Sequence, residues 1–245
     1  MLIGALACVA GASLTADLLT STSDGPGAAE PASVPAPACP APKRGVWRGS
    51  DSAVHAVAVT FDDGPSAGTR AILRALRRHD AKATFFLVGR EIPGREGIVR
   101  RAAREGHELG NHSTSHSALP SEADVANTSN LITRITGGPP CVFRPPAGRT
   151  SRLLIRDVHR LGMTTVTWDV DTGDWAFQLP AAIRDRALAG VRPGSIILMH
   201  DGGGERAGTA RSLSAVIEGL RGRGYELVTV SELLRNAPTL RPPKR

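Results

Sequence analysis

Short apolar runs rich in β-branched residues alternate with longer amphipathic stretches through most of this chain. This alternation is typical of βα units, in which helices connect parallel strands. The runs expected as strands are Ala53–Phe61, Ala83–Leu87, Glu108–Asn111, Val142–Arg144, Thr164–Trp168, Ser195–Met199 and Glu226–Val228. Thr69–His79 and Leu213–Arg223 are examples of the expected helices. About seven βα units, with no phosphate-binding glycine motif after the first strand, favour a closed or nearly closed α/β barrel over an open sheet.

Composition divides the chain into four segments. Residues 1–20 are mostly apolar and include Ala10-Gly11-Ala12, a plausible cleavage site, so we expect a signal peptide or an N-terminal anchor. Residues 21–45 form a Pro/Ala-rich linker, 46–236 a single globular domain and 237–245 a basic tail. The protein is therefore expected to be secreted or associated with the cell envelope.

Three cysteines are too few for a disulfide scaffold: Cys8, Cys39 and Cys141. Cleavage of a signal peptide would remove Cys8 and leave one pair in an oxidising compartment. We therefore expect Cys39 and Cys141 to form a disulfide that ties the linker to the domain. Two free thiols are the alternative.

The chain is basic, with 30 Lys and Arg against 23 Asp and Glu and a net charge of +7. Such a balance predicts an anionic partner, either nucleic acid or an acidic cell-wall polymer. Aromatic residues make up only 4% of the chain and are not interleaved with basic clusters, which argues against nucleic acid. No apolar run reaches the roughly 18 residues of a spanning helix, which excludes a multi-pass membrane protein.

Polar residues gather where the expected strands end. Asp62 and Asp63 follow the first strand, and two adjacent carboxylates there require a cation or a shared proton. His112 and His116 are four residues apart, a spacing that on a helical turn places both imidazoles on one face. Together with Asp63 they would make three ligands with an open position, as in a catalytic zinc site. A non-heme iron oxygenase uses similar ligands and is the second enzyme class, although its usual scaffold is all-β.

Three further strand ends carry candidate functional groups. Arg144 is followed by two prolines, and a cluster of acids and indoles includes Asp174 and Trp175. His200 ends a fully apolar strand, where a nearby carboxylate would raise its pKa and suit it to act as a general acid. Each residue alone could be a surface or capping group, but the convergence of all of them at strand ends favours an active site.

These segments, in this order, resemble the motif set of the polysaccharide deacetylases, carbohydrate esterase family 4. The matching segments are Thr60-Phe61-Asp62-Asp63-Gly64-Pro65, His112-Ser113-x-x-His116, Arg144-Pro145-Pro146-x-Gly148, Asp171-x-x-Asp174-Trp175 and Leu198-x-His200. They cover roughly residues 55 to 235, so the domain 46–236 is expected to be the deacetylase catalytic domain.

The resemblance implies an α/β fold of the distorted (β/α) barrel type that binds a divalent metal, with Zn2+ the favoured ion, and that hydrolyses N-acetyl groups of amino sugars. The export signal, the basic domain and the linker favour GlcNAc-type polymers as substrates, either peptidoglycan or chitooligosaccharide. The resemblance assigns Asp62 as the base, Arg144 as its orienting partner, His200 as the acid and Asp174 as the residue that tunes His200. The implied metal ligands are Asp63, His112 and His116. The implied substrate contacts are the Ala147 N–H, where many members carry tyrosine, and the side chains of Trp175 and Leu198.

Two alternatives to this function stay open. One is an acetylxylan O-deacetylase, and the other is a cationic cell-wall-binding protein without activity. The expected partner is an extracellular or cell-wall polysaccharide, with no nucleic acid and no stable protein partner.

Overall fold

The computed structural model of the chain describes residues 39–51, 54–176, 179–236 and 239–240. These residues belong to one compact unit, Val34–Arg245. The expected signal peptide or anchor at 1–20 lies outside the described residues, as do most of the linker and most of the tail. Within the described part, no helix is both long enough and apolar enough to span a membrane.

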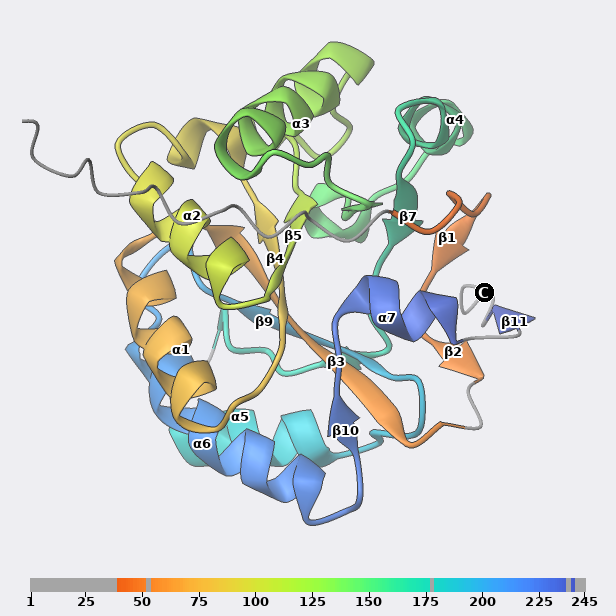
Figure 1. Ribbon diagram of the computed structural model, residues 1–245. Coiled ribbons are helices and arrows are strands. Elements are labelled where there is room, and N and C mark those ends of the chain that lie inside the picture. Colours follow the sequence, from red (N-terminus) through yellow and green to blue (C-terminus); the bar gives the residue numbers. More distant parts are fainter. Residues whose placement is uncertain (1–38, 52–53, 177–178, 237–238, 241–245) are drawn as a thin grey trace, which may run out of the picture. The chain divides into compact units, whose positions relative to one another are not determined.

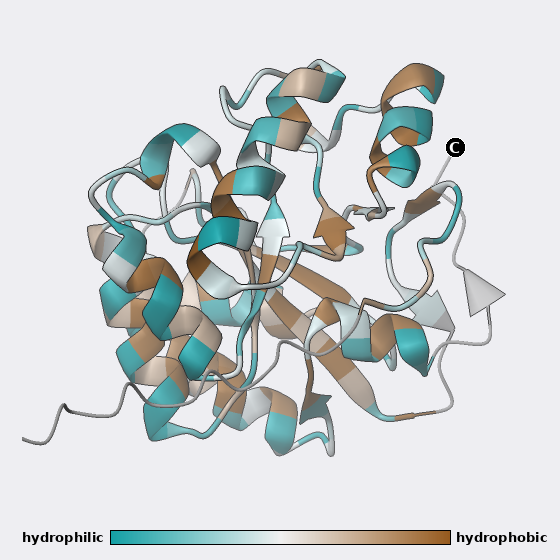
Figure 2. Ribbon diagram, turned by 45° about the horizontal axis from the view of Figure 1, so that its top comes forward, coloured by the Kyte–Doolittle hydropathy of each residue, from teal (hydrophilic) through white to brown (hydrophobic). Residues whose placement is uncertain are grey.

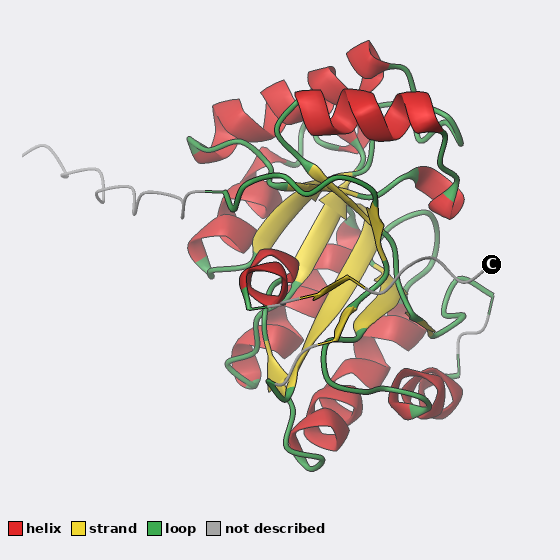
Figure 3. Ribbon diagram, turned by 90° about the vertical axis from the view of Figure 1, so that its right-hand side faces the viewer, coloured by secondary structure: helices red, strands yellow, loops and turns green. Residues whose placement is uncertain are grey.

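A curled sheet of parallel strands forms the centre of this unit (Figures 1 and 3), in agreement with the α/β class and the distorted barrel expected from the sequence. Its strand order is β1-β7-β6-β5-β4-β3-β9-β8, and β10 pairs with the first residues of β3. The strands of this sheet are β1 (Val46–Trp47), β3 (Ala56–Gly64), β4 (Thr84–Leu87), β5 (Glu108–Asn111), β6 (Val142–Phe143), β7 (Thr164–Val166), β8 (Val170–Asp171), β9 (Ile196–His200) and β10 (Glu226–Leu227). A separate antiparallel pair joins β2 (Ser50–Asp51) to β11 (Thr239–Leu240).

Helices pack around the sheet. They are α1 (Ala67–Arg78), α2 (Glu96–Arg104), α3 (Glu122–Thr136), α4 (Arg152–Arg160), α5 (Pro180–Leu188), α6 (Ala207–Arg221) and α7 (Val230–Arg235). In α1, for example, Ile72, Leu73 and Leu76 are buried and lie on one face, because residues three and four apart are neighbours on a helix. Figure 2 shows that the strands are mostly apolar, whereas the helices are amphipathic, with one apolar and one polar face. The helices thus supply the second layer of the core.

Strand β3 differs from its expected bounds in a way that matters for the site. It runs from Ala56 to Gly64 and not from Ala53 to Phe61, so Asp62 and Asp63 belong to the strand itself. Asp62 is in register with Phe86 of β4 on one side and His200 of β9 on the other. The sheet therefore fixes the backbone of Asp62 on both sides.

The N-terminal segment bridges two distant strands of the curled sheet. Strand β1 pairs with β7, and the residues that follow β1 contact the start of β9. Gly49 forms a β-bridge with Ser195, and Ser50 N donates a hydrogen bond to Gly194 O at 2.8 Å. Trp47 is 1% exposed and belongs to the core. Residues before the first long strand therefore help to hold the sheet in its curled form.

A disulfide joins Cys39 to Cys141, as expected from the cysteine count. Cys141 immediately precedes β6, the strand that leads into Arg144. The bond therefore ties the N-terminal segment to the part of the sheet that carries a candidate site residue.

Reduction of this disulfide is expected to lower the free energy of unfolding substantially. The two cysteines are 102 residues apart, and a closed loop of that size restricts the unfolded chain by about 4 to 5 kcal/mol in the chain-entropy account. Urea unfolding of the Cys39→Ser/Cys141→Ser variant measures the loss, with Asp185→Asn on the exposed surface of α5 as the control. Equal stability of the double variant and the control would contradict a structural role for the bond.

Candidate active site

Seven polar side chains meet at the carboxyl end of the parallel sheet. Asp62 and Asp63 lie near the end of β3, and His200 ends β9. The other four follow β5, β6 and β8 directly or after a short loop: His112, His116, Arg144 and Asp174. Because parallel strands present their carboxyl ends at the same edge, the fold brings together residues that are far apart in the sequence.

Asp62 and Arg144 form a buried ion pair. Asp62 is 3% exposed and Arg144 is fully buried, and the Arg144 Nη1 donates to Asp62 Oδ1 at 2.7 Å. The same guanidinium also donates to Thr60 Oγ1 at 2.7 Å and to Thr167 O at 3.1 Å, and it lies over the Phe86 ring. A buried charge is tolerated when it is paired and hydrogen-bonded. Arg144 thus fixes one carboxylate oxygen of Asp62 and leaves the other oxygen available.

Asp63 lies between the two histidines. Its Oδ1 is 3.0 Å from His116 Nε2 and 3.6 Å from His112 Nε2. Burial opposes ionisation of Asp63, but His116 and His112 outweigh it and lower the pKa of this carboxyl to about 2. Burial lowers the pKa of His112, whereas the contact with Asp63 raises the pKa of His116. Asp63 is therefore ionised, and His112 is held in its neutral form, which can act as a ligand.

The backbone that presents the two histidines differs from the expected helical turn. Residues 112–116 form a loop in which Ser113 and His116 have positive φ values of 62° and 58°. The side chain of Asn111 stabilises this loop, because its Oδ1 accepts from Ser113 N at 2.8 Å. The expected geometry was wrong, yet the rings still meet, with centroids 5.0 Å apart.

The donor set of Asp63, His112 and His116 fits a divalent metal. One carboxylate oxygen and two imidazole nitrogens lie within 4.8 Å of one another. The Nδ1 of His112 contacts Arg144 O at 2.6 Å, which leaves Nε2 to face Asp63. Metal-binding histidines commonly donate their second nitrogen to a carbonyl in this way. Zinc is suited to such nitrogen and oxygen donors.

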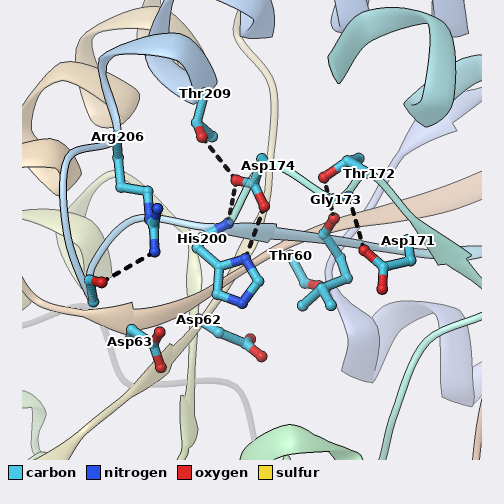
Figure 4. A network of polar contacts seen from close by, with 12 residues as sticks. Thr60, Asp62, Asp63, Asp171, Thr172, Gly173, Asp174, His200, Arg206 and Thr209 are labelled. Atoms are coloured by element: carbon cyan, nitrogen blue, oxygen red, sulfur yellow. Dashed lines mark hydrogen bonds and ion pairs between the residues drawn. The ribbon is translucent and has the colours of Figure 1, made fainter. Parts of the chain in front are cut away.

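His200 and Asp174 form a second buried pair (Figure 4). Asp174 Oδ1 contacts His200 Nδ1 at 2.8 Å, and its Oδ2 accepts from His200 N at 2.8 Å and from Thr209 Oγ1 at 2.7 Å. The imidazole lies between Asp174 and Asp62 in the close-up, so its Nε2 is on the side away from Asp174. Burial lowers the pKa of His200, but Asp174 and the charge of Asp62 outweigh it and raise that pKa.

The three expected substrate contacts, Ala147, Leu198 and Trp175, differ in how far they are exposed. Ala147 is exposed in a short turn with φ of 54°, and Leu198 is 3% exposed on β9. Trp175 follows Asp174 and is 61% exposed, next to residues 177–178, which lie outside the described part. The indole of Trp175 is therefore open to solvent.

Sequence reasoning missed four residues that support these groups. Thr60 Oγ1 accepts a hydrogen bond from Arg144, and Thr209 Oγ1 donates one to Asp174. The Asp201 carboxyl packs against Gly64, accepts from Thr69 Oγ1 and has its pKa raised to about 7 by burial. Arg206 donates to the carbonyls of Gly202 and Gly203, which holds the glycine loop beside Asp63. Two of the four had a sequence signal, because Thr60 lies in the first matched segment and Asp201 directly follows His200.

Comparison with known proteins agrees with this geometry. The family model for polysaccharide deacetylases matches residues 49–166. The chitooligosaccharide deacetylase of Azorhizobium caulinodans is 35% identical over 188 residues, which cover 69% of this chain and 90% of that protein. The chain belongs to the polysaccharide deacetylase family.

Two further relatives of this family act on peptidoglycan according to their names. The peptidoglycan-N-acetylglucosamine deacetylase PgdA of Listeria monocytogenes is 36% identical over 184 residues, or 72% of this chain. The match spans only 38% of the length of PgdA. The crystal structure of the Bc1960 peptidoglycan N-acetylglucosamine deacetylase superposes with a TM-score of 0.75 at 32% identity, covering 78% of this chain and 94% of that one. The similarity to this family therefore extends from the sequence to the fold.

Proposed function

We propose that this chain is a secreted, metal-dependent deacetylase that hydrolyses N-acetyl groups of GlcNAc-type polymers. The observation that carries the proposal is the meeting of a buried carboxylate, a three-residue donor set and a carboxylate-bound histidine at one end of the sheet. Amide hydrolysis needs a base for the attacking water, charge stabilisation for the carbonyl oxygen and an acid for the leaving amine. The buried carboxylate is the base, the three-residue donor set would hold the ion that stabilises charge, and the histidine is the acid.

The first half of the reaction is addition of water to the acetyl carbonyl. A divalent ion bound by Asp63, His112 and His116 would supply Lewis acidity, which polarises the carbonyl and makes water more acidic. Asp62 accepts the proton of the attacking water on the oxygen that Arg144 does not occupy. Arg144 holds Asp62 in this orientation, because it is buried and has no other carboxylate partner among the described residues.

The second half is loss of the amine. His200 donates a proton from Nε2 to the departing nitrogen, because its Nδ1 is held by Asp174. Asp174 stabilises the protonated imidazole and fixes its orientation. The product is a free amino sugar and acetate.

The remaining contacts are proposed from the family resemblance. The N–H of Ala147 would donate to the developing oxyanion, and a backbone donor does not depend on the side chain at that position. The side chains of Leu198 and Trp175 would line the pocket for the acetyl group.

The substrate class is inferred from the relatives, whose names specify peptidoglycan N-acetylglucosamine and chitooligosaccharide. The Cys39–Cys141 disulfide supports an extracellular or envelope location, because such bonds persist in oxidising compartments. The apolar segment at 1–20 would direct export.

Acetate release by the purified full chain tests the function. Chitooligosaccharide, peptidoglycan and acetylxylan are compared, each with metal-stripped protein and after zinc is restored. We expect zinc-dependent acetate from at least one aminoglycan. Acetate from acetylxylan alone would show that the substrate is an O-acetylated xylan and not an aminoglycan. No acetate from any polymer would overturn the enzyme assignment.

The Asp174→Asn variant is expected to lose activity at alkaline pH earlier than the wild type. The acid must be protonated, so kcat/KM falls as pH rises through the pKa of His200, and Asp174 raises that pKa. Removing the carboxylate should therefore shift the alkaline limb of the profile to lower pH. The pH profile of kcat/KM on a soluble chitooligosaccharide measures the shift, with Asp185→Asn on α5 as the control. An unchanged alkaline limb would contradict the role of Asp174.

A further inference from the structure

Helices α1 and α2 present an arginine-rich surface outside the active site. The two helices contact each other and lie side by side against the sheet (Figure 1). Every exposed charged residue within them is arginine, and the six are Arg70, Arg74, Arg77, Arg78, Arg100 and Arg104. We call these six residues the arginine face. Helix α1 contains no acidic residue, and the single acid of α2, Glu96, is half-buried.

Within the described part of the fold, the arginine face makes no specific side-chain contact, although Arg77, Arg78 and Arg104 lie in the last turns of their helices, where a cation is favourable. Among the described residues, none of the six guanidinium groups makes an ion pair or a side-chain hydrogen bond, whereas neighbouring Arg95 and Arg101 are paired with Glu91 and Glu105. Six like charges that repel one another across two touching helices are not stabilising by themselves. An external anion would remove this repulsion.

The spacing of the arginines suits a chain of regularly placed negative charges. Arg70, Arg74 and Arg78 are four residues apart, and the helical rise sets their Cα atoms about 6 Å apart along the axis. Guanidinium groups bind phosphate in a forked geometry, so a regular row of them suits a polymer that carries a phosphate in every repeat. Arg100 and Arg104 repeat the spacing on α2.

The composition of the surface discriminates between polyanions. Binding of single-stranded nucleic acid uses aromatic side chains on which bases stack, and neither helix contains an aromatic residue. Binding to a membrane surface uses exposed large apolar residues, and the exposed uncharged residues of these helices are only Ala67 and Gly97. A flexible polymer that carries phosphates without bases or acyl chains matches the surface best.

We propose that the arginine face binds a linear phosphodiester polymer of the poly(glycerol phosphate) type. The first turn of α1 follows Asp63 by only a few residues, so Arg70 lies at the end of the arginine face nearest the active site. A bound polymer would hold the enzyme on an anionic wall with the site still open. The proposal concerns binding and does not depend on the deacetylase activity.

Binding of the full chain to fluorescently labelled, acyl-free poly(glycerol phosphate) tests this proposal. The key variant is Arg70→Gln/Arg74→Gln/Arg78→Gln. The matched control is Arg44→Gln/Arg134→Gln/Arg152→Gln, which removes the same charge from exposed arginines on three separate segments. Dissociation constants are measured between about 50 and 200 mM salt, because the salt dependence reports the number of phosphate contacts.

We expect the key variant to bind at least about tenfold more weakly than the wild type at low salt, with a shallower log–log salt slope. The slope should decrease by about 2, since each lost contact on a flexible chain removes about 0.7. The control should lose much less affinity and keep the wild-type slope. Unchanged melting temperature and unchanged acetate release from a small soluble substrate would show that the key variant is folded.

Three results would overturn the proposal. The first is absence of wild-type binding at about 50 mM salt, where phosphate contacts are strong. The second is equal weakening of the key variant and the control, which would indicate non-specific attraction by the net charge. The third is tighter binding of oligothymidylate than of poly(glycerol phosphate), with the same dependence on the arginine face, which would identify a nucleic acid as the partner.

Discussion

The Asp62→Asn variant should retain its metal and lose almost all activity. The amide of asparagine can still accept from Arg144 through its oxygen, so the buried contact at 2.7 Å has a replacement. It cannot accept a proton from water at neutral pH. The loss of a general base lowers kcat by about 10²- to 10⁴-fold. Acetate release and metal content, measured on the same preparation, provide the two readouts.

The neighbouring carboxylate provides a sharp comparison for this experiment. Asp63→Asn removes a charged metal ligand, because the Asp63 Oδ1 lies 3.0 Å from His116 Nε2 in the proposed metal site. This variant should therefore lose metal as well as activity. Asp185→Asn, on the exposed surface of α5, should change neither. If Asp62→Asn kept wild-type turnover, or if it lost metal while Asp63→Asn retained it, the assignment of base and ligand would be wrong.

The sequence was sufficient to predict which strand ends meet. The reason is physical, because a buried parallel strand places the residue after its last apolar position at the carboxyl edge of the sheet. Asp62, Asp63 and His200 are found through this rule alone. Periodicity also predicted a helix over Thr69–His79, close to the observed α1 (Ala67–Arg78), which carries four of the six arginines.

Local geometry could not be predicted in the same way. The loop that carries His112 and His116 depends on positive φ values and on an Asn111 hydrogen bond, and spacing gives no sign of either. The support of Asp174 by Thr209 joins residues 35 positions apart, and the Arg144 contact with Thr60 joins residues 84 apart. Such contacts depend on the folded path of the chain and not on a local pattern.

Alanine at His112 should remove both the metal and the activity. His112 Nε2 faces Asp63, and its Nδ1 is fixed by the carbonyl of Arg144 at 2.6 Å, so no other described side chain is placed to substitute for it. Loss of an outer-shell partner of a metal ligand costs about 10- to 100-fold in affinity, and loss of the ligand itself should cost more than about 100-fold. Competition with a chelator of known zinc affinity measures this change.

Thermal unfolding separates a lost metal site from a damaged fold. Zinc at 100 times its dissociation constant should stabilise the wild type by about 2.7 kcal/mol, because the ion binds the folded state. The His112→Ala variant should melt without this gain, close to the temperature of the metal-free wild type. His159→Ala, on α4 and away from the site, should keep the full gain. A zinc-induced rise of wild-type size in His112→Ala would show that the ion binds elsewhere, and the proposed ligand set would then have to be abandoned even if Asp62→Asn behaved as expected.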